Sequence, residues 1–313
     1  MGTPMDQQNI ASPPYLEAMH KLLEVLTNRY TSFWLHPQFM FKLLGHKKMQ
    51  DDALKILHHV SNTVVQKKRS EFLIKKNNNE KDPETGRPFR AFLDLMLELT
   101  AKEGIFTDQE IREEVDTIIA AGQETTSSTV LYTLLLLGTH QEQQQKVYDE
   151  IREIFKNSDR DVSREDLKRL IYLEATLKES MRLYPVVPAV IRQIERDLKL
   201  KDYTLPAGSS CAVSMWGLHR HERWGPDYDS FRPERWLDAG ALPAHPAAFA
   251  AFAHGKRGCI VIRGKPILWL QYKNGAVLLV KCYTRTYYGD KVAAFSPVLH
   301  ISNGPLPLFP FVT

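Results

Sequence analysis

The sequence predicts an α+β protein that is mainly α, with one long central helix and a small β region. Apolar residues recur at helical spacing through the first two thirds of the chain, whereas short β-like segments and turns follow residue 184. The 313 residues are 43% hydrophobic and 25% charged, which is ordinary for a globular protein. A helix-rich body beside a small β region is therefore the expected architecture.

The first helices are predicted over residues 15–30 and 50–75, where apolar positions repeat every three to four residues. Residues 66–90 are basic and rich in asparagine, and they contain proline and glycine. We interpret this stretch as a solvated surface connection rather than a binding patch.

A long helix is predicted from Thr107 to Leu137. Thr107-Asp-Gln-Glu110 has the pattern of a capping box, and Gly138 offers a stop. About 30 residues at about 1.5 Å each give a rod of about 45 Å. Its middle, Ala121-Gly-Gln-Glu-Thr-Thr-Ser-Ser128, is polar and forms helix weakly. A buried helix seldom tolerates such an insert without a functional reason.

The later elements are shorter. Residues 140–156 predict a charged helix, and Ser163-Arg-Glu-Asp166 predicts the N-terminal cap of a helix over residues 167–183. The remaining segments are read as β-like (Ala189–Ile194, Leu198–Leu205, Ser210–Met215), as irregular loops (Pro233–Trp236, Phe252–Cys259), as helix (266–283) and as short strands with proline-rich turns (292–313).

Composition excludes several classes of protein. A net charge of +4 without an RNP, zinc-finger or basic-zipper pattern gives no support for nucleic-acid binding. The three cysteines are widely spaced and form no Cys-x-x-Cys pair, so neither a disulfide framework nor a structural zinc site is expected. The chain has no run of about 18 apolar residues, and its polar first residues are not expected to act as a signal peptide.

Cys259 stands alone at the end of a basic, glycine-containing loop, Phe252-Ala-His-Gly255-Lys-Arg257-Gly-Cys259. Such a loop can turn backbone N–H groups toward the sulfur, and Arg257 adds positive charge. Both effects stabilise a thiolate, the form that binds a metal. Taken alone, a lone cysteine is more often an inert core residue.

Two pairs of polar residues also have two interpretations each. Glu179 and Arg182 share one helical face, where the alternative to a functional pair is a surface ion pair worth about 0.2–0.5 kcal/mol. Glu124 and Thr125 lie in the polar insert of the long helix. An acid–alcohol pair for proton delivery and a polar stripe bonded to backbone carbonyls are equal alternatives there.

Together these patterns resemble a known family. Ala121–Thr126, Glu179-Ser-Met-Arg182, Pro233-Glu-Arg-Trp236 and Phe252–Cys259 follow one another in an order that is similar to the cytochrome P450 superfamily. Leu173–Pro185 resembles its microsomal branch, which includes fatty-acid ω-hydroxylases. The resemblance implies the C-terminal portion of the cytochrome P450 fold, with residues 1–313 as a single partial domain lacking the N-terminal part and membrane anchor.

The resemblance implies a haem site. Cys259 is expected to be the proximal thiolate ligand of the haem iron. Other residues expected to bind haem are Phe252 and Gly255 in the cysteine loop, with Arg257 and Arg192 at the propionates. Residues expected to hold the proximal core together are Glu179, Arg182 and Arg235.

The resemblance also implies a distal side. Thr125 with Glu124 is expected to steer protons to dioxygen. Residues expected to line a substrate pocket are Ala120, Ala121, Val187 and Val190.

The implied reaction inserts one atom of dioxygen into a small apolar substrate, with electrons from NADPH. The implied cofactor is haem b, iron protoporphyrin IX. The implied partners are NADPH-cytochrome P450 reductase and cytochrome b5, with Lys256, Arg263 and Lys265 as a basic docking face for the reductase. The family implies the endoplasmic reticulum membrane as location, although this chain is expected to carry no anchor or signal.

Three departures from the family pattern are visible. Val261 stands where the family has glycine, and a β-branched residue does not adopt glycine-only backbone angles. About three extra residues follow, and Pro266 is expected to restart the helix. Ala121 stands where members with an ester-linked haem have glutamate, so no covalent link is expected.

Two further hypotheses remain beside the monooxygenase. One is a truncated, non-catalytic fragment that does not bind haem stably. The other is a haem-thiolate isomerase or peroxygenase that needs no reductase, against which the Glu124–Thr125 pair argues.

Overall fold

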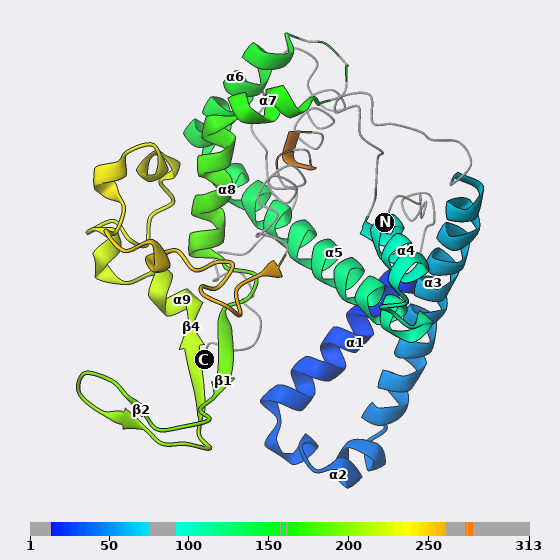
Figure 1. Cartoon of the computed structure of the whole chain (residues 1–313). Helices are drawn as coiled ribbons and strands as arrows, with labels where there is room; N and C mark the ends of the chain where they lie inside the picture. The colour runs from blue at the N-terminus through cyan, green and yellow to red at the C-terminus, as the bar shows by residue number, and fades with distance from the viewer. Residues whose placement is uncertain are drawn as a thin grey trace. The chain divides into compact units, whose positions relative to one another are not determined.

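The structure is a computed structural model that describes residues 14–75, 92–156, 158, 160, 162–260, 273 and 275–277 (Figure 1). The chain divides into two compact units, of which the first runs to Gly122 and the second begins at Gln123. The division falls inside α5 (Asp108–Thr139), the long helix expected from Thr107 to Leu137. The expected mainly α architecture with a small β region is confirmed. Whether residues 1–313 form one partial domain stays a prediction.

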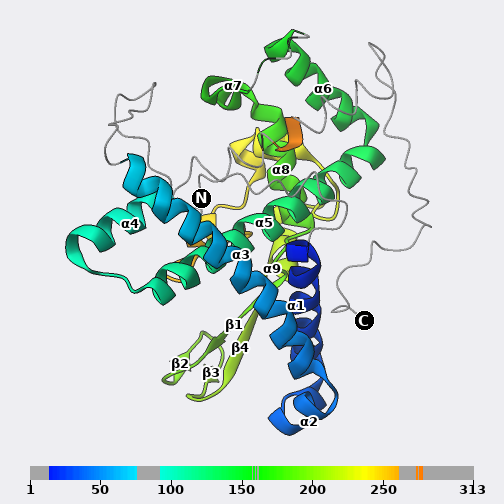
Figure 2. The ribbon, with the colours of Figure 1, turned by 90° about the vertical axis from the view of Figure 1, so that its right-hand side faces the viewer.

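The first unit is helical. Its elements before α5 are α1 (Pro14–Thr31), η2 (Phe33–Leu35), α2 (Gln38–Leu43), α3 (His46–Lys75) and α4 (Phe92–Glu103). Helices α1 and α3 lie side by side, with α2 at the turn between them (Figures 1 and 2). Tyr15, Ala18 and Met19 lie on one face of α1 because they are three and four residues apart, and they pack with Ala53 and Leu57 of α3.

Two predictions about this unit need correction. The helix expected over residues 50–75 is confirmed, because α3 continues to Lys75, and the surface connection expected over residues 66–90 is therefore wrong for its first ten residues. Residues 76–91 lie outside the described residues. Helix α4 was not predicted, although buried Leu93, Met96 and Leu97 repeat at helical spacing.

The N-terminus of α5 has the predicted capping box. The backbone N–H of Glu110 donates to the Thr107 hydroxyl (3.2 Å), and the Glu110 carboxylate accepts from the Thr107 backbone (2.7 Å). The bond from the Thr107 backbone N–H, together with a second one from the Thr107 hydroxyl (2.8 Å), holds the pKa of the Glu110 carboxyl below its ordinary value.

Among the described helices, none is both long and apolar enough to cross a membrane.

The second unit continues with α6 (Gln141–Phe155), α7 (Arg164–Arg169), α8 (Ile171–Leu183) and α9 (Met215–His219). The predicted single helix over residues 167–183 is wrong, because the chain leaves helical geometry at Leu170. The Glu150 carboxylate of α6 accepts from the backbone N–H groups of Tyr172 (2.7 Å) and Leu173 (2.9 Å). A side chain distant in sequence therefore caps a new helix start.

The described β region is an extended hairpin arm made of two two-stranded antiparallel sheets. Strand β1 (Ala189–Gln193) pairs antiparallel with β4 (Ser210–Ser214), with Arg192 opposite Cys211. Strands β2 (Leu198–Lys199) and β3 (Thr204–Leu205) pair at its tip (Figure 2). The segment read as one β-like stretch from Leu198 to Leu205 is thus two short strands and their turn.

Short 3-10 helices follow α9: η3 (Glu222–Trp224), η4 (Pro233–Trp236), η5 (Ala239–Ala241) and η6 (Pro246–Ala248). The segment Pro233–Trp236, expected to be an irregular loop, is η4 and packs against α8. Residues 252–259 are irregular, as expected. In the helix expected over 266–283, the described residues 273 and 275–277 are helical, and the tail over 292–313 lies outside the described residues.

Candidate functional site

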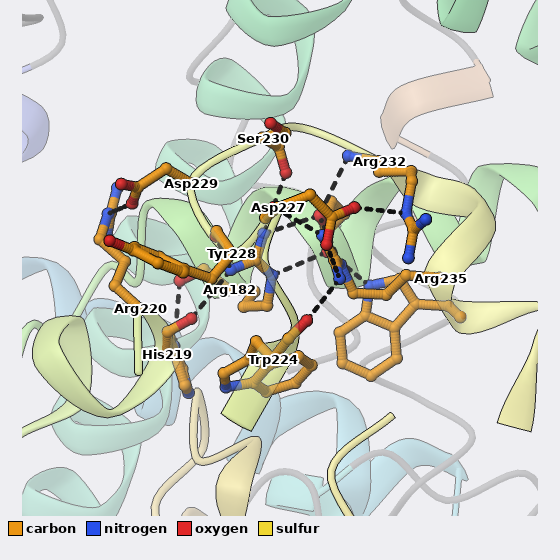
Figure 3. A network of polar contacts seen from close by, with 12 residues as sticks. Arg182, His219, Arg220, Trp224, Asp227, Tyr228, Asp229, Ser230, Arg232 and Arg235 are labelled. Atoms are coloured by element: carbon orange, nitrogen blue, oxygen red, sulfur yellow. Dashed lines mark hydrogen bonds and ion pairs between the residues drawn. The ribbon is translucent and has the colours of Figure 1, made fainter. Parts of the chain in front are cut away.

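A buried network of charges lies between α8 and η4 (Figure 3). Glu179 and Arg182 of α8 and Arg235 of η4 are at most 1% exposed. The Glu179 carboxylate accepts from Arg182 Nε (2.9 Å), Arg182 Nη2 (2.8 Å) and Arg235 Nε (3.1 Å). The alternative interpretation of Glu179 and Arg182 as a surface ion pair is therefore wrong.

The Glu179 carboxylate has two further donors. The Trp236 indole Nε1 donates to Oε2 (2.9 Å), and the backbone N–H of Arg232 donates to Oε1 (3.0 Å). Five donors around one carboxylate compensate for its removal from water.

Arg182 binds the connecting loops through its remaining N–H groups. Its guanidinium donates to the backbone oxygens of His219 (2.8 Å), Tyr228 (2.5 Å) and Ser230 (3.1 Å). Figure 3 shows Arg182 in the middle of the network, with His219 and Tyr228 on one side and Arg235 on the other. All five guanidinium N–H groups are thus used, which lysine could not reproduce.

Asp227 balances the second arginine. Arg235 donates through Nη1 to Asp227 Oδ1 (3.2 Å), and Arg232 Nε lies 2.9 Å from Asp227 Oδ2. Burial acts to raise the pKa of Asp227, but the bond from Arg235 and the charges of both arginines outweigh it and lower that pKa. The two buried arginines are therefore matched by two carboxylates.

The loop that ends at Cys259 is closed by its own backbone. The N–H of Cys259 donates to the Phe252 oxygen (2.9 Å), and that of Gly258 donates to the Gly255 oxygen (3.0 Å). Gly255 has a φ of 81°, and a Cβ on Gly258 would lie 3.2 Å from the Gly255 oxygen. Glycine is thus required twice to bring the chain back on itself.

The loop presents a half-buried thiol beside positive charge. Cys259 is a free cysteine of intermediate exposure, while Lys256 and Arg257 are exposed. Phe252 packs against the core of the second unit. A fixed backbone, a single soft thiol and cationic neighbours in the sequence fit a haem iron, because a cysteine thiolate is one of the side chains that can hold it.

The polar insert of α5 is partly satisfied by backbone carbonyls. Ser127 of the insert donates to the Gln123 oxygen (2.9 Å), and Thr129, directly after the insert, donates to the Thr125 oxygen (2.8 Å). Glu124 and Thr125 are half-buried. The charge of Glu124, after the larger effect of burial, raises the pKa of Tyr132 on the same helix. The two alternatives for Glu124–Thr125 both remain open.

The other residues expected at the site lie on separate elements. Ala120 and Ala121 are half-buried in the first unit, with Ala120 packed against its α1–α3 core. In the second unit Val187 is 44% exposed and Val190 is half-buried. Arg192 of β1 is exposed, and its guanidinium donates to the Ile191 oxygen (2.8 Å). The four residues expected to line a pocket are not on the wall of a cavity of about 480 Å³ beside Trp224 and Asp227.

Comparison with known proteins identifies the family. The cytochrome P450 family model matches residues 1–264. The chain belongs to the cytochrome P450 family. Cytochrome P450 4c21 of Blattella germanica is 34% identical over 262 residues, or 83% of this chain and 52% of that relative. Cytochrome P450 4V2 of Homo sapiens is 34% identical over 268 residues, or 83% and 50%.

A third relative aligns over a longer part of the chain. Cytochrome P450 4d2 of Drosophila melanogaster is 30% identical over 314 residues, or 97% of this chain and 62% of that relative. This chain spans about half the length of the curated cytochrome P450 relatives it matches. The family match ends at residue 264, within the stretch after Cys259 where the sequence departs from the cytochrome P450 pattern.

Sequence reasoning missed four residues of this network: Trp224, Asp227, Trp236 and His219. Trp236 belongs to the Pro233–Trp236 motif, so its position was visible, but its bond to Glu179 was not. Trp224, Asp227 and His219 precede that motif without a recognisable spacing. Their roles depend on how the cytochrome P450 loops fold back onto α8.

Proposed function

We propose that this chain forms the haem-thiolate portion of a cytochrome P450 monooxygenase, with Cys259 as the axial ligand. The observation that carries the proposal is the cysteine loop, in which Cys259 is fixed by its bond to the Phe252 oxygen beside Lys256 and Arg257. Haem held there supplies the activation of dioxygen for insertion of one oxygen atom into a substrate.

The residues around Cys259 would each have a separate role in holding haem. Phe252 would pack beside the thiolate, and Gly255 would let the loop turn. Arg257 and Arg192 would pair with the propionates, since both guanidinium groups lie on exposed surfaces of the second unit. Glu179, Arg182 and Arg235 would keep α8 and η4 together under the haem.

The distal side would be formed by the polar insert of α5. Thr125 would hold a proton-donating hydroxyl, and Glu124 would hold or deliver the proton. Ala120, Ala121, Val187 and Val190 would contact a small apolar substrate. A fatty-acid-like substrate is the class that the resemblance to ω-hydroxylases supports.

Electrons would come from NADPH through cytochrome P450 reductase, with cytochrome b5 as a second donor, at the endoplasmic reticulum membrane. Exposed Lys256 supports an acidic partner on this face, whereas Arg263 and Lys265, also expected there, lie outside the described residues.

Haem titration of the 313-residue chain tests the ligand. We expect stoichiometric binding, and a thiolate-type Soret band after reduction with carbon monoxide. Cys259→Ala should lose that band, whereas Cys211→Ala, at the other described free cysteine, should keep it. The same spectrum, recorded on a chain extended at its N-terminus, shows how much of the haem binding depends on the residues present here and how much on the extension.

The second candidate is a fragment that does not retain haem, and Val261 after the cysteine favours it. Absence of the thiolate band in both the 313-residue and the extended chain would establish this candidate and reject the first. A Val261→Gly variant that gains the band in the 313-residue chain would locate the defect.

A further inference from the structure

His219, the last residue of α9, is a buried histidine that none of the four motifs contains. It is 0% exposed. Its Nδ1 lies 3.1 Å from the backbone oxygen of Arg182, and its Nε2 lies 2.9 Å from the backbone nitrogen of Ala250. A carbonyl oxygen only accepts and a backbone N–H only donates. The ring therefore carries its hydrogen on Nδ1 and accepts through Nε2.

The bond to Arg182 is one half of a reciprocal pair. The Arg182 guanidinium donates to the backbone oxygen of His219 (2.8 Å), while the His219 ring donates to the backbone oxygen of Arg182. Each residue thus uses its side chain to hold the backbone of the other. This arrangement fixes the position of the imidazole relative to α8, the helix of the buried charge network.

Aromatic packing fixes the orientation of the ring. Phe249 stacks on His219 with ring centres 5.4 Å apart and an angle of 24°. Phe249 also packs against Trp236, with ring centres 4.7 Å apart and an edge-on geometry. The residue just before Ala250 therefore contacts both the imidazole and the indole that donates to Glu179.

Ala250 is where the cysteine loop departs from this packed region. Its oxygen accepts from the backbone N–H of Ala253 (2.9 Å), and the Phe252 oxygen accepts from that of Cys259 (2.9 Å). Ala250 is 5% exposed, whereas the loop beyond it becomes exposed from His254 to Arg257. The bond from Ala250 to His219 is thus a buried polar connection at the start of the loop.

We propose that His219 is a positioning residue for Cys259, tying the start of the cysteine loop to the backbone of Arg182. The neutral Nδ1–H ring is the connector, because it satisfies a carbonyl on α8 and an N–H on the loop at once. The consequence for haem rests on the proposed function, but the connection itself exists in the chain without haem.

Two variants separate this role from simple packing. His219→Phe keeps an aromatic ring against Phe249 but loses both hydrogen bonds. His219→Gln loses the stacking but places an amide oxygen near the position of Nε2, where it can accept from Ala250. If the ring only fills space, Phe is the better replacement; if it positions the loop, Gln is.

The test uses the 313-residue chain with Cys211→Ser and Cys282→Ser, so that Cys259 is its single thiol. The readouts are hydrogen exchange at the Ala250 and Cys259 amides and the rate of Cys259 modification by an aromatic disulfide reagent. We expect His219→Phe to raise all three rates on the order of tenfold. We expect His219→Gln to stay closer to the parent.

Exchange at α3 amides of the first unit serves as the folding control and should match the parent in both variants. Parent-like rates in His219→Phe, or rates in His219→Gln as high as in His219→Phe, would overturn the proposal. Because these rates are measured without haem, they decide the role of His219 even where haem titration fails.

Discussion

Glu179 shows how one carboxylate can organise a buried region. It accepts five hydrogen bonds, from Arg182, Arg235, Arg232 and Trp236, while no part of it reaches solvent. Desolvation makes such a cluster costly to form, so its net contribution to stability is smaller than the number of bonds suggests. Removing the Glu179 carboxylate is nevertheless destabilising, because two buried guanidinium groups would then lack their shared counter-charge.

Glu179→Gln should therefore destabilise the second unit by about 3–5 kcal/mol, since it leaves buried arginine charge uncompensated. Urea unfolding followed by tryptophan fluorescence measures this loss, because Trp224 and Trp236 lie beside the network. Glu165→Gln is the matched control: this exposed residue pairs with Lys168 and should change stability by less than about 1 kcal/mol. A loss for Glu179→Gln no larger than that of the control would contradict the structure.

The buried imidazole of His219 makes stability depend on pH. Burial, together with the charges of Arg182 and Arg220, lowers the pKa of His219 to about 4, against an ordinary 6.5. Between these values the unfolded chain binds the proton more readily, so stability is full above about pH 6.5 and falls as the pH drops toward 4.

The stability difference between the parent and His219→Gln should therefore shrink by up to about 3 kcal/mol from pH 6.5 to pH 4, because glutamine does not titrate. Denaturant unfolding of both proteins across this range measures the difference. A difference that stays constant with pH would show that His219 is not held neutral.

At the scale of the element, the capping interactions at helix ends explain helix boundaries that hydrophobic periodicity alone did not predict. Helix α7 begins at a capping box in which Ser163 and Asp166 bond each other's backbone. Helix α8 begins after a single residue, Leu170, that separates it from α7, because Glu150 of α6 supplies its N-terminal acceptor. The capping box of α7 is local and can be predicted from the sequence. The cap of α8 requires α6 to be packed against α8.

The C-terminus of α6 contains a strained residue. Lys156 has a φ of 46° and a ψ of 46°, the left-handed region, and its N–H donates to the Arg152 oxygen (2.8 Å). Glycine adopts this conformation without a Cβ penalty, so Lys156→Gly should stabilise the second unit by about 1 kcal/mol.

Thermal unfolding measures this gain. Lys156→Ala retains the Cβ and should remain within about 0.5 kcal/mol of the parent, which separates backbone strain from loss of the lysine side chain. A lower melting temperature for Lys156→Gly than for Lys156→Ala would show that the left-handed geometry is not present in solution.

At the scale of the whole molecule, the first unit exposes large apolar side chains. Phe33 and Leu43 are each 75% exposed and Phe39 is 68% exposed, all within one short stretch around η2 and α2. Single exposed apolar residues are ordinary, but several that lie close together in the sequence favour contact with another apolar surface.

Replacing Phe33, Phe39 and Leu43 together by serine should reduce self-association of the 313-residue chain, as measured by sedimentation velocity. Ile171→Ser removes an isolated side chain that is 60% exposed and should have little effect. Equal association in the parent and the triple variant would show that this group is not the contact surface.

Much of the architecture was predictable because the responsible interactions are local. The long helix follows from its capping box and apolar periodicity. The fold class follows from the change near residue 184 from helical periodicity to short β-like segments and turns. Helix α4 carried the same kind of signal and was overlooked. The single helix over 167–183 was a reasonable inference from periodicity, and it is wrong because Glu150 acts from another helix.

The sequence by itself determined the family, the fold class and the candidate site residues Cys259, Glu179, Arg182 and Arg235. These features follow from motif spacing and hydrophobic periodicity, which depend only on residues close together in the chain. Only the tertiary structure decided that Glu179 is the shared, fully buried acceptor of both arginines and Trp236. It also decided that His219 links Arg182 to Ala250. The physical reason is that desolvation and hydrogen-bond satisfaction depend on which distant segments close around a group, and no local pattern encodes that closure.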